Sequence, residues 1–213
     1  MHSALTYELL TSHAVLDHLP RDQWISLRSI ITELILATDM TRHFNLVEKF
    51  NEKYANCSLP MATFEDKIAL YKMCMKCADI GHAGKTVELH HKWSLKVAEE
   101  FFHQGDLERE QGLPISMFCD RLNVDLSASQ SDFILKLVKP LFRAVNAVVR
   151  SSTIESVIIE QLDVNQTFWR NQVQRKKRAS VAPGVLSVQE EEPPRRENSL
   201  GKVGKRVVAE ENL

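Results

Sequence analysis

Glycine and proline are scarce over most of this chain, and that scarcity restricts the fold more than any other feature. Residues 1–173 contain four glycines and four prolines. Between them run long segments in which apolar residues recur every three or four positions, and no alternation of apolar and polar residues persists. This pattern predicts an all-α fold, a compact helical bundle.

Helix signals divide residues 1–173 into seven expected helices. Thr63 and Asp66 are spaced like a capping box and predict the start of the helix that ends at Asp79. Pro140 predicts a kink in the helix that contains it. The expected helices cover approximately 4–17, 23–39, 41 into the 50s, 64–79, 86–104, 129 to beyond 142, and 153–173.

Bulk composition indicates one soluble domain. The chain has 213 residues, of which 44% are apolar, and its net charge is −1, which gives no reason to expect nucleic acid or an acidic membrane surface as a partner. The sequence shows no spanning segment and no secretory signal. We therefore expect a cytoplasmic protein with reduced thiols, and interpret the lone Cys74–Cys77 pair as two buried thiols rather than a zinc or redox site.

The composition changes after Trp169, the last aromatic residue. The tail has charge blocks, three prolines and three glycines, and no helical periodicity, so we expect residues 174–213 to form a disordered charged tail. Ser180 and Ser199 follow basic residues as in sites of basophilic kinases such as the cAMP-dependent kinase. The alternative is a solvated linker without regulation.

Several polar residues at helix ends are candidates for chemistry. Asp79 ends an apolar helix and is followed by His82 in a glycine-bearing loop, which suggests either a solvated helix end or ligands at the mouth of a site. Asp39 and His43, four residues apart, would be neighbours on one helix face. They form either a helix-end pair or a pair that orients a ligand.

Two further pairs lie on expected helices. His90 and the adjacent His91 would point about 100° apart, as a surface histidine beside a half-buried one. Gln130 and Phe133, three residues apart, share a face. A glutamine amide suits a purine edge and a phenyl ring can stack on the same base, although taken alone the two residues are better explained as a first-turn glutamine beside a core phenylalanine.

Four segments in fixed order resemble one family. They are ILATDMTRH (35–43), KCADIGHAGKTVELHHKWS (76–94), AEEFFHQGDLEREQGLPISMFCDR (98–121) and SQSDFI (129–134). Together they are similar to the catalytic domain of the class I cyclic-nucleotide phosphodiesterases, the helical HD-type hydrolases of cAMP and cGMP. The resemblance covers approximately residues 2–172 and identifies 1–173 as a partial phosphodiesterase catalytic domain.

The resemblance implies roles for individual residues. Enzymes of this family hold two divalent metals, zinc with magnesium or manganese, and Asp79 matches one of the metal-binding aspartates. Asp39 lies at the pocket floor as a residue that supports the site. The residues that match substrate-pocket positions are Gln130 at the purine edge, Phe133 against the base, and His82, His90, Val97, Phe101, Met40 and Phe118 around them.

The chain departs from the family pattern in two respects. Ala83 replaces a common proline, and His2 matches the second histidine of the family's NHH segment, so the HNxxH and HD segments with the general-acid histidine are not in this sequence. We therefore expect a full-length parent to hydrolyse cyclic nucleotides and this chain alone to be nearly inactive. The alternative is a non-catalytic helical protein that binds a nucleotide or a partner through a degenerate phosphodiesterase pocket.

Overall fold

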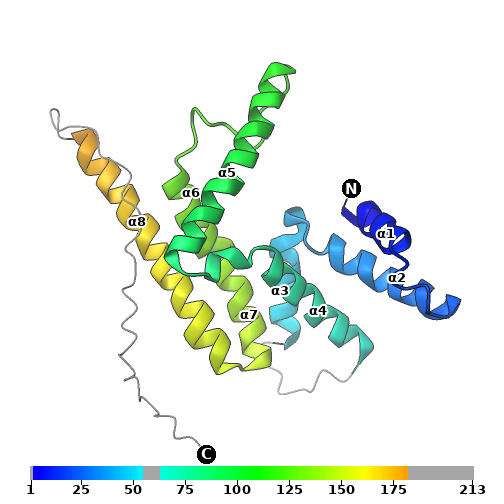
Figure 1. Ribbon diagram of the computed structural model, residues 1–213. Helices are drawn as coiled ribbons and strands as arrows, with labels where there is room; N and C mark the ends of the chain where they lie inside the picture. Colours follow the sequence, from blue (N-terminus) through cyan, green and yellow to red (C-terminus); the bar gives the residue numbers. More distant parts are fainter. Residues whose placement is uncertain (1, 55–62, 182–213) are drawn as a thin grey trace, which may run out of the picture.

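The structure, a computed structural model, describes residues 2–54 and 63–181, and these residues form helices and no β-strand (Figure 1). The prediction of an all-α fold is therefore confirmed. The elements are α1 (His2–Ser12), α2 (Arg21–Leu36), η1 (Met40–Arg42), α3 (His43–Tyr54), α4 (Phe64–Asp79), η2 (Gly81–Gly84), α5 (Val87–Glu110), α6 (Leu126–Phe133), η3 (Ile134–Val138), α7 (Lys139–Val149), η4 (Ile154–Ile159) and α8 (Glu160–Val181).

Several helices end at other residues than predicted, since α1 already ends at Ser12 and not near 17, and α5 continues to Glu110 beyond the predicted 104. Helix α8 continues to Val181, so residues 174–181 are helical and the predicted start of disorder at 174 is wrong. An ion pair explains part of this extension, because the Lys176 ammonium lies 3.2 Å from the Asp125 carboxylate at the start of α6. The rest of the predicted tail lies outside the described residues.

The capping box predicted at the start of α4 is present. The Thr63 side chain accepts a hydrogen bond from the Asp66 amide, and the Asp66 carboxylate accepts one from the Thr63 amide. The same carboxylate accepts hydrogen bonds from Lys53 (2.8 Å) and Tyr54 (2.6 Å) of α3. The cap that begins α4 therefore also joins α4 to α3.

Helices α6, η3 and α7 form one helical run that passes through a π-helical segment. The π-helical residues, η3, come immediately before Lys139 and Pro140, at the place where the sequence predicts a kink. Proline has no backbone N–H, and a π-helical turn next to it adjusts the hydrogen-bond pattern of the helix to the missing donor. The run packs into two apolar clusters, one with α3 and α4 (Val47, Phe50, Tyr54, Met73, Leu141, Ala144, Val145) and one with η2 and α8 (Ala83, Ile134, Val138, Phe142, Ile159, Leu162, Trp169).

The N-terminal hairpin, α1 and α2, lies at one side of the molecule (Figure 1). None of its residues is buried, and it contacts the bundle through α4, where Lys72 forms an ion pair with Glu33. Within the hairpin, the Tyr7 hydroxyl shares a hydrogen bond of 2.6 Å with Thr32. Among the described helices none is both long and apolar enough to cross a membrane.

Two expectations about buried residues are corrected. Cys74 is exposed and Cys77 is partly buried, so the Cys74–Cys77 pair is not the pair of buried thiols that we predicted. His90 is fully buried and not half-buried. The buried face of α5 runs through His90, Ser94, Ala98 and Gly105, so α5 packs on the bundle mainly through small and polar side chains.

Candidate functional site

The loop between α4 and α5 is held from the side by α8. Helix α4 ends at Asp79, Ile80 caps it, and η2 follows. The amide nitrogen of Asn165, a fully buried residue of α8, donates hydrogen bonds to the carbonyls of Ala83 (2.7 Å) and Lys85 (2.8 Å). Since a side chain from α8 holds two carbonyls of this loop, the position of His82 in the loop depends on α8.

His90 of α5 is fully buried and its hydrogen bonds define its protonation. The Trp169 indole N–H of α8 donates to His90 Nε2 at 2.7 Å, so Nε2 is an acceptor and the ring proton of the neutral imidazole resides on Nδ1. Burial, reinforced by the nearby His82 and His91, lowers the pKa of His90 to about 3. His90 is therefore a neutral hydrogen-bonding group at physiological pH.

His82 lies against both His90 and the ring of Phe133. The His82 and His90 rings are stacked with centroids 5.3 Å apart, and their Nδ1 atoms are 3.3 Å apart. The Phe133 ring is nearly parallel to His82, with an angle of 13° between planes and 6.1 Å between centroids. Burial, followed by the Lys85 charge, lowers the pKa of His82. The three rings form one aromatic wall.

Ser94 connects the histidines to Gln130. The Ser94 hydroxyl donates to Gln130 Oε1 at 3.0 Å and lies 3.4 Å from His90 Nδ1. Because Gln130 Oε1 is occupied in this way, the two amide hydrogens of Gln130 remain for another acceptor. We call Trp169, His90, His82, Ser94 and Gln130 the histidine–glutamine network.

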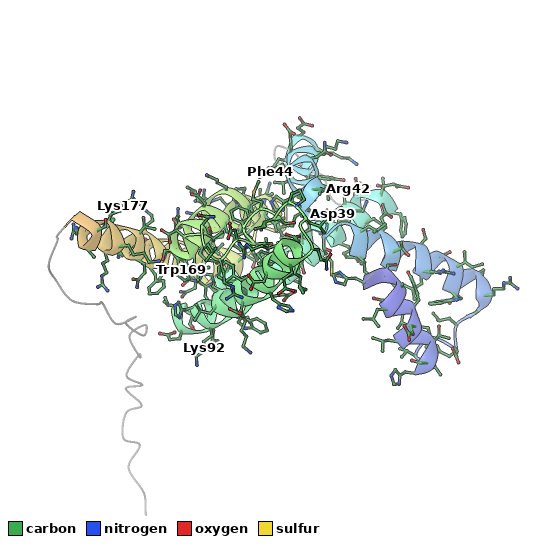
Figure 2. All side chains as sticks on the ribbon, turned by 90° about the horizontal axis from the view of Figure 1, so that it is seen from above. Asp39, Arg42, Phe44, Lys92, Trp169 and Lys177 are labelled. Carbon is green, nitrogen blue, oxygen red and sulfur yellow. The ribbon has the colours of Figure 1, made fainter. Side chains whose placement is uncertain are left out.

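Figure 2 shows Trp169 among the crowded side chains of the bundle, whereas Lys177 stands on the end of α8 that projects from it. Val97 and Phe101 lie seven and eleven residues after His90 on α5, so helical geometry places them on the same face as the network. The structure thus brings together four of the predicted pocket residues (His82, His90, Gln130, Phe133) on η2, α5 and α6. Val97 is partly buried farther along α5, and Phe101 is exposed there.

Other predicted residues lie apart from the network. Met40 is an exposed residue of η1, and Phe118 is an exposed residue with left-handed backbone (φ 68°) between α5 and α6. The Asp39 carboxylate caps η1 and accepts from the amide and hydroxyl of Thr41, which lowers the pKa of Asp39. The expected Asp39–His43 pair therefore does not form, and His43 instead begins α3 as a buried residue.

Asp79, the predicted metal ligand, is exposed at the end of α4. Across residues 2–54 and 63–181, no group of three or more His, Cys, Asp or Glu side chains is placed to hold a metal ion. One exposed carboxylate does not supply the three or four ligands that a protein zinc site uses. The described residues therefore do not by themselves fit the metal centre that the family resemblance implies.

Ser94, Asn165 and Trp169 were not predicted to take part in the site. Asn165 had one local signal, because asparagine competes with the backbone for hydrogen bonds and is unfavourable inside a helix unless its side chain has partners elsewhere. Trp169 had a weaker local signal, because it is the last aromatic residue before the composition changes. Nothing near Ser94 in the sequence indicates that its hydroxyl connects two predicted residues.

Comparison with known proteins places the chain in a family. A family model described as 3'5'-cyclic nucleotide phosphodiesterase matches residues 1–161. A dual specificity calcium/calmodulin-dependent 3',5'-cyclic nucleotide phosphodiesterase 1 of Drosophila melanogaster is 38% identical over 141 residues, 65% of this chain and 16% of that protein. The probable 3',5'-cyclic-AMP phosphodiesterase pde-4 of Caenorhabditis elegans is 32% identical over 180 residues, 81% of this chain and 26% of that protein.

Solved structures show the same fold. The structure of LmjPDEB1 in complex with IBMX has a TM-score of 0.73 and 23% sequence identity, and the match covers 82% of this chain and 52% of that one. The chain belongs to the 3',5'-cyclic nucleotide phosphodiesterase family, whose enzymes depend on metal ions. It spans between one sixth and about one quarter of the length of the two curated relatives named above.

Proposed function

We propose that this chain is part of an enzyme that hydrolyses 3',5'-cyclic nucleotides to 5'-nucleoside monophosphates, and that its described residues form the purine-binding part of the site. The observation that carries this proposal is the hydrogen-bond series from Trp169 through His90 and Ser94 to Gln130, next to the Phe133 ring. A fixed amide beside a flat apolar ring suits the edge and the face of a purine.

The orientation of Gln130 supports recognition of both adenine and guanine. Ser94 donates to Gln130 Oε1, so the amide group offers hydrogens to a ligand. Adenine has N7 as an acceptor on its edge, and guanine has N7 and O6, so either base can accept from this amide. We therefore propose that cAMP and cGMP both bind.

A metal centre would need ligands in addition to those that the described residues supply. We propose that Asp79 is one ligand of a pair of divalent ions, zinc with magnesium or manganese, in a complete catalytic domain. Bound metal ions would neutralise phosphate charge and activate water there. Within the histidine–glutamine network, Gln130 would meet the base, while His90 and Ser94 position Gln130 and Trp169 holds His90 from α8. Asn165 holds the loop of His82 from the same helix.

Calorimetric titration of the chain with cAMP and with cGMP tests the purine site. The unchanged chain should bind both nucleotides. Gln130→Glu should weaken binding of both by about tenfold or more, because a carboxylate cannot donate to the base. The matched control is Gln111→Glu, the same change at an exposed residue after α5. Absence of binding by the unchanged chain, or equal affinity in Gln130→Glu, would contradict the proposal.

We also propose Ser180 as a site for a basophilic kinase such as the cAMP-dependent kinase. Ser180 is exposed in the last turn of α8, where its hydroxyl donates to the Lys177 carbonyl at 2.8 Å. A phosphate at a helix C-terminus is electrostatically unfavourable, so modification should unwind this turn. Mass spectrometry after incubation with the kinase and ATP should show phosphate on Ser180, and its absence there would refute the assignment. Ser199, the other predicted site, lies outside the described residues.

A further inference from the structure

Asn165, a buried polar residue of α8, lies outside the residues that face the proposed ligand. Asn165 is fully buried, and three of the four hydrogen-bonding positions of its amide group, including both N–H donors, are used. Its two amide hydrogens go to the Ala83 and Lys85 carbonyls, and its Oδ1 accepts from Gln161 Nε2 at 3.0 Å. Buried hydrogen bonds of this kind are costly to lose, because each unpaired partner keeps its desolvation cost.

The same loop has a second close contact with the η4–α8 segment. A Cβ added at Gly84 would lie 2.8 Å from Ile158 Cγ2, closer than side-chain atoms normally approach. Ala83, the residue before Gly84, is fully buried. The loop backbone therefore approaches η4 closely at Gly84 and is hydrogen-bonded to α8 on either side of that point.

Two contacts from one face of α8 reach the two histidines of the network. Asn165 and Trp169 are one helical turn apart, so they point in the same direction. Asn165 holds the loop that carries His82, and Trp169 holds His90. The His82–His90 stacking, with Nδ1 atoms 3.3 Å apart, follows from both contacts together.

We propose that Asn165 is a positioning residue for purine binding, which holds His82 against His90 and Phe133 by fixing the backbone at Ala83 and Lys85. This inference rests on the proposed function, since the purine is the ligand that the positioned rings would contact. Asn165 itself contacts the loop and not the ligand.

The variant Asn165→Asp tests this role with almost no change in size. A carboxylate next to two carbonyl oxygens cannot donate to them, so amide hydrogen exchange at residues 81–86 should become at least about tenfold faster at pH 8. At pH 5.5 the carboxyl group, whose pKa burial raises, is protonated and regains one donor. The exchange should then slow towards that of the unchanged chain, a pH dependence that loss of packing alone would not produce.

The matched control is Asn171→Asp, the same chemical change at an exposed position of the same helix. It should leave exchange at 81–86 unchanged at both pH values. A milder second variant, Gln161→Ala, removes the donor to Asn165 Oδ1 and should accelerate exchange in the same segment by a smaller factor. This variant keeps the proposal testable if Asn165→Asp does not fold.

Nucleotide binding then separates the two proposals. Asn165→Asp should weaken cAMP and cGMP binding at pH 8 and recover part of the affinity at pH 5.5. If the unchanged chain binds neither nucleotide, the proposed function fails, and the positioning of the loop is decided by hydrogen exchange alone. Unchanged exchange at 81–86 in both Asn165→Asp and Gln161→Ala would overturn the inference.

Discussion

Asp79 and His82 are three residues apart and have opposite surroundings. His82 is stacked between His90 and Phe133 in a loop held by two hydrogen bonds from α8. Asp79 is exposed, and its carboxylate makes no side-chain hydrogen bond within the described residues but interacts electrostatically with the buried Lys76. The proposed base-binding half of the site is thus held in place by contacts among these residues, whereas the proposed metal-binding half contributes one exposed carboxylate.

Catalysis should show the largest difference between the two halves. Hydrolysis of a cyclic phosphodiester needs a proton donor for the leaving oxygen, and such a group contributes a factor of about 10²–10⁴. We expect the chain to turn over cAMP or cGMP at least about 100-fold more slowly than a complete phosphodiesterase catalytic domain assayed with zinc and magnesium. A rate within about tenfold of that control would contradict this expectation and show that the chain supplies its own proton donor.

Loss of the Trp169–His90 hydrogen bond should have the largest effect on stability. Trp169→Phe keeps an aromatic ring but leaves the buried His90 Nε2 without its donor, which should cost about 1–3 kcal/mol in the free energy of unfolding. Chemical denaturation measures this value. The control is Trp93→Phe on the exposed face of α5, which should change stability much less. Equal effects of the two substitutions would contradict a structural role for the hydrogen bond.

Acid should destabilise the base-binding half through His90. Its pKa is about 3 in the fold and near 6.5 in the unfolded chain, so between these values the unfolded chain binds the extra proton. The free energy of unfolding should therefore fall as pH decreases below 6.5, by about 2 kcal/mol from His90 at pH 5. The lowered pKa values of His82 and His43 act in the same direction.

The variant His90→Gln isolates this contribution, since its amide oxygen can accept from Trp169 and does not titrate in this range. Denaturation curves between pH 7.5 and 5 should show a shallower pH dependence for the variant. An unchanged slope would mean that His90 is not neutral and buried.

Asp79 should show the smallest effect. Because its carboxylate is exposed and solvent screens its charge interaction with Lys76, Asp79→Asn should change the free energy of unfolding by less than about 1 kcal/mol. Nucleotide affinity of the chain should also stay within about twofold, since the base and not the phosphate meets the described residues. A clear loss of affinity in calorimetry would place Asp79 in the base-binding half.

Local patterns predicted the helices well where both ends carried strong signals. The Thr63–Asp66 capping box and Pro140 gave a helix start and an irregularity at the correct positions, because both act through neighbouring backbone groups. The end of α8 was predicted too early. Its last turns are polar and have no apolar stripe, and the Lys176–Asp125 ion pair that helps to hold them joins residues 51 positions apart.

The candidate site was predicted only in part. The family segments indicated Gln130, Phe133, His82 and His90, and the structure brings these four together. The Asp39–His43 pair failed because the helix ends at Leu36 and a separate turn follows, so spacing along the sequence did not give a shared helix face.

Periodicity and motifs are properties of neighbouring residues, and they were enough to predict the helical fold and the family. Tertiary contacts settle which histidine is buried, which way Gln130 presents its amide, and that Asn165 holds the His82 loop. The physical reason is distance along the chain. Asn165 and Trp169 meet their partners across approximately 80 residues, and a hydrogen bond between such distant groups has no pattern in the local sequence.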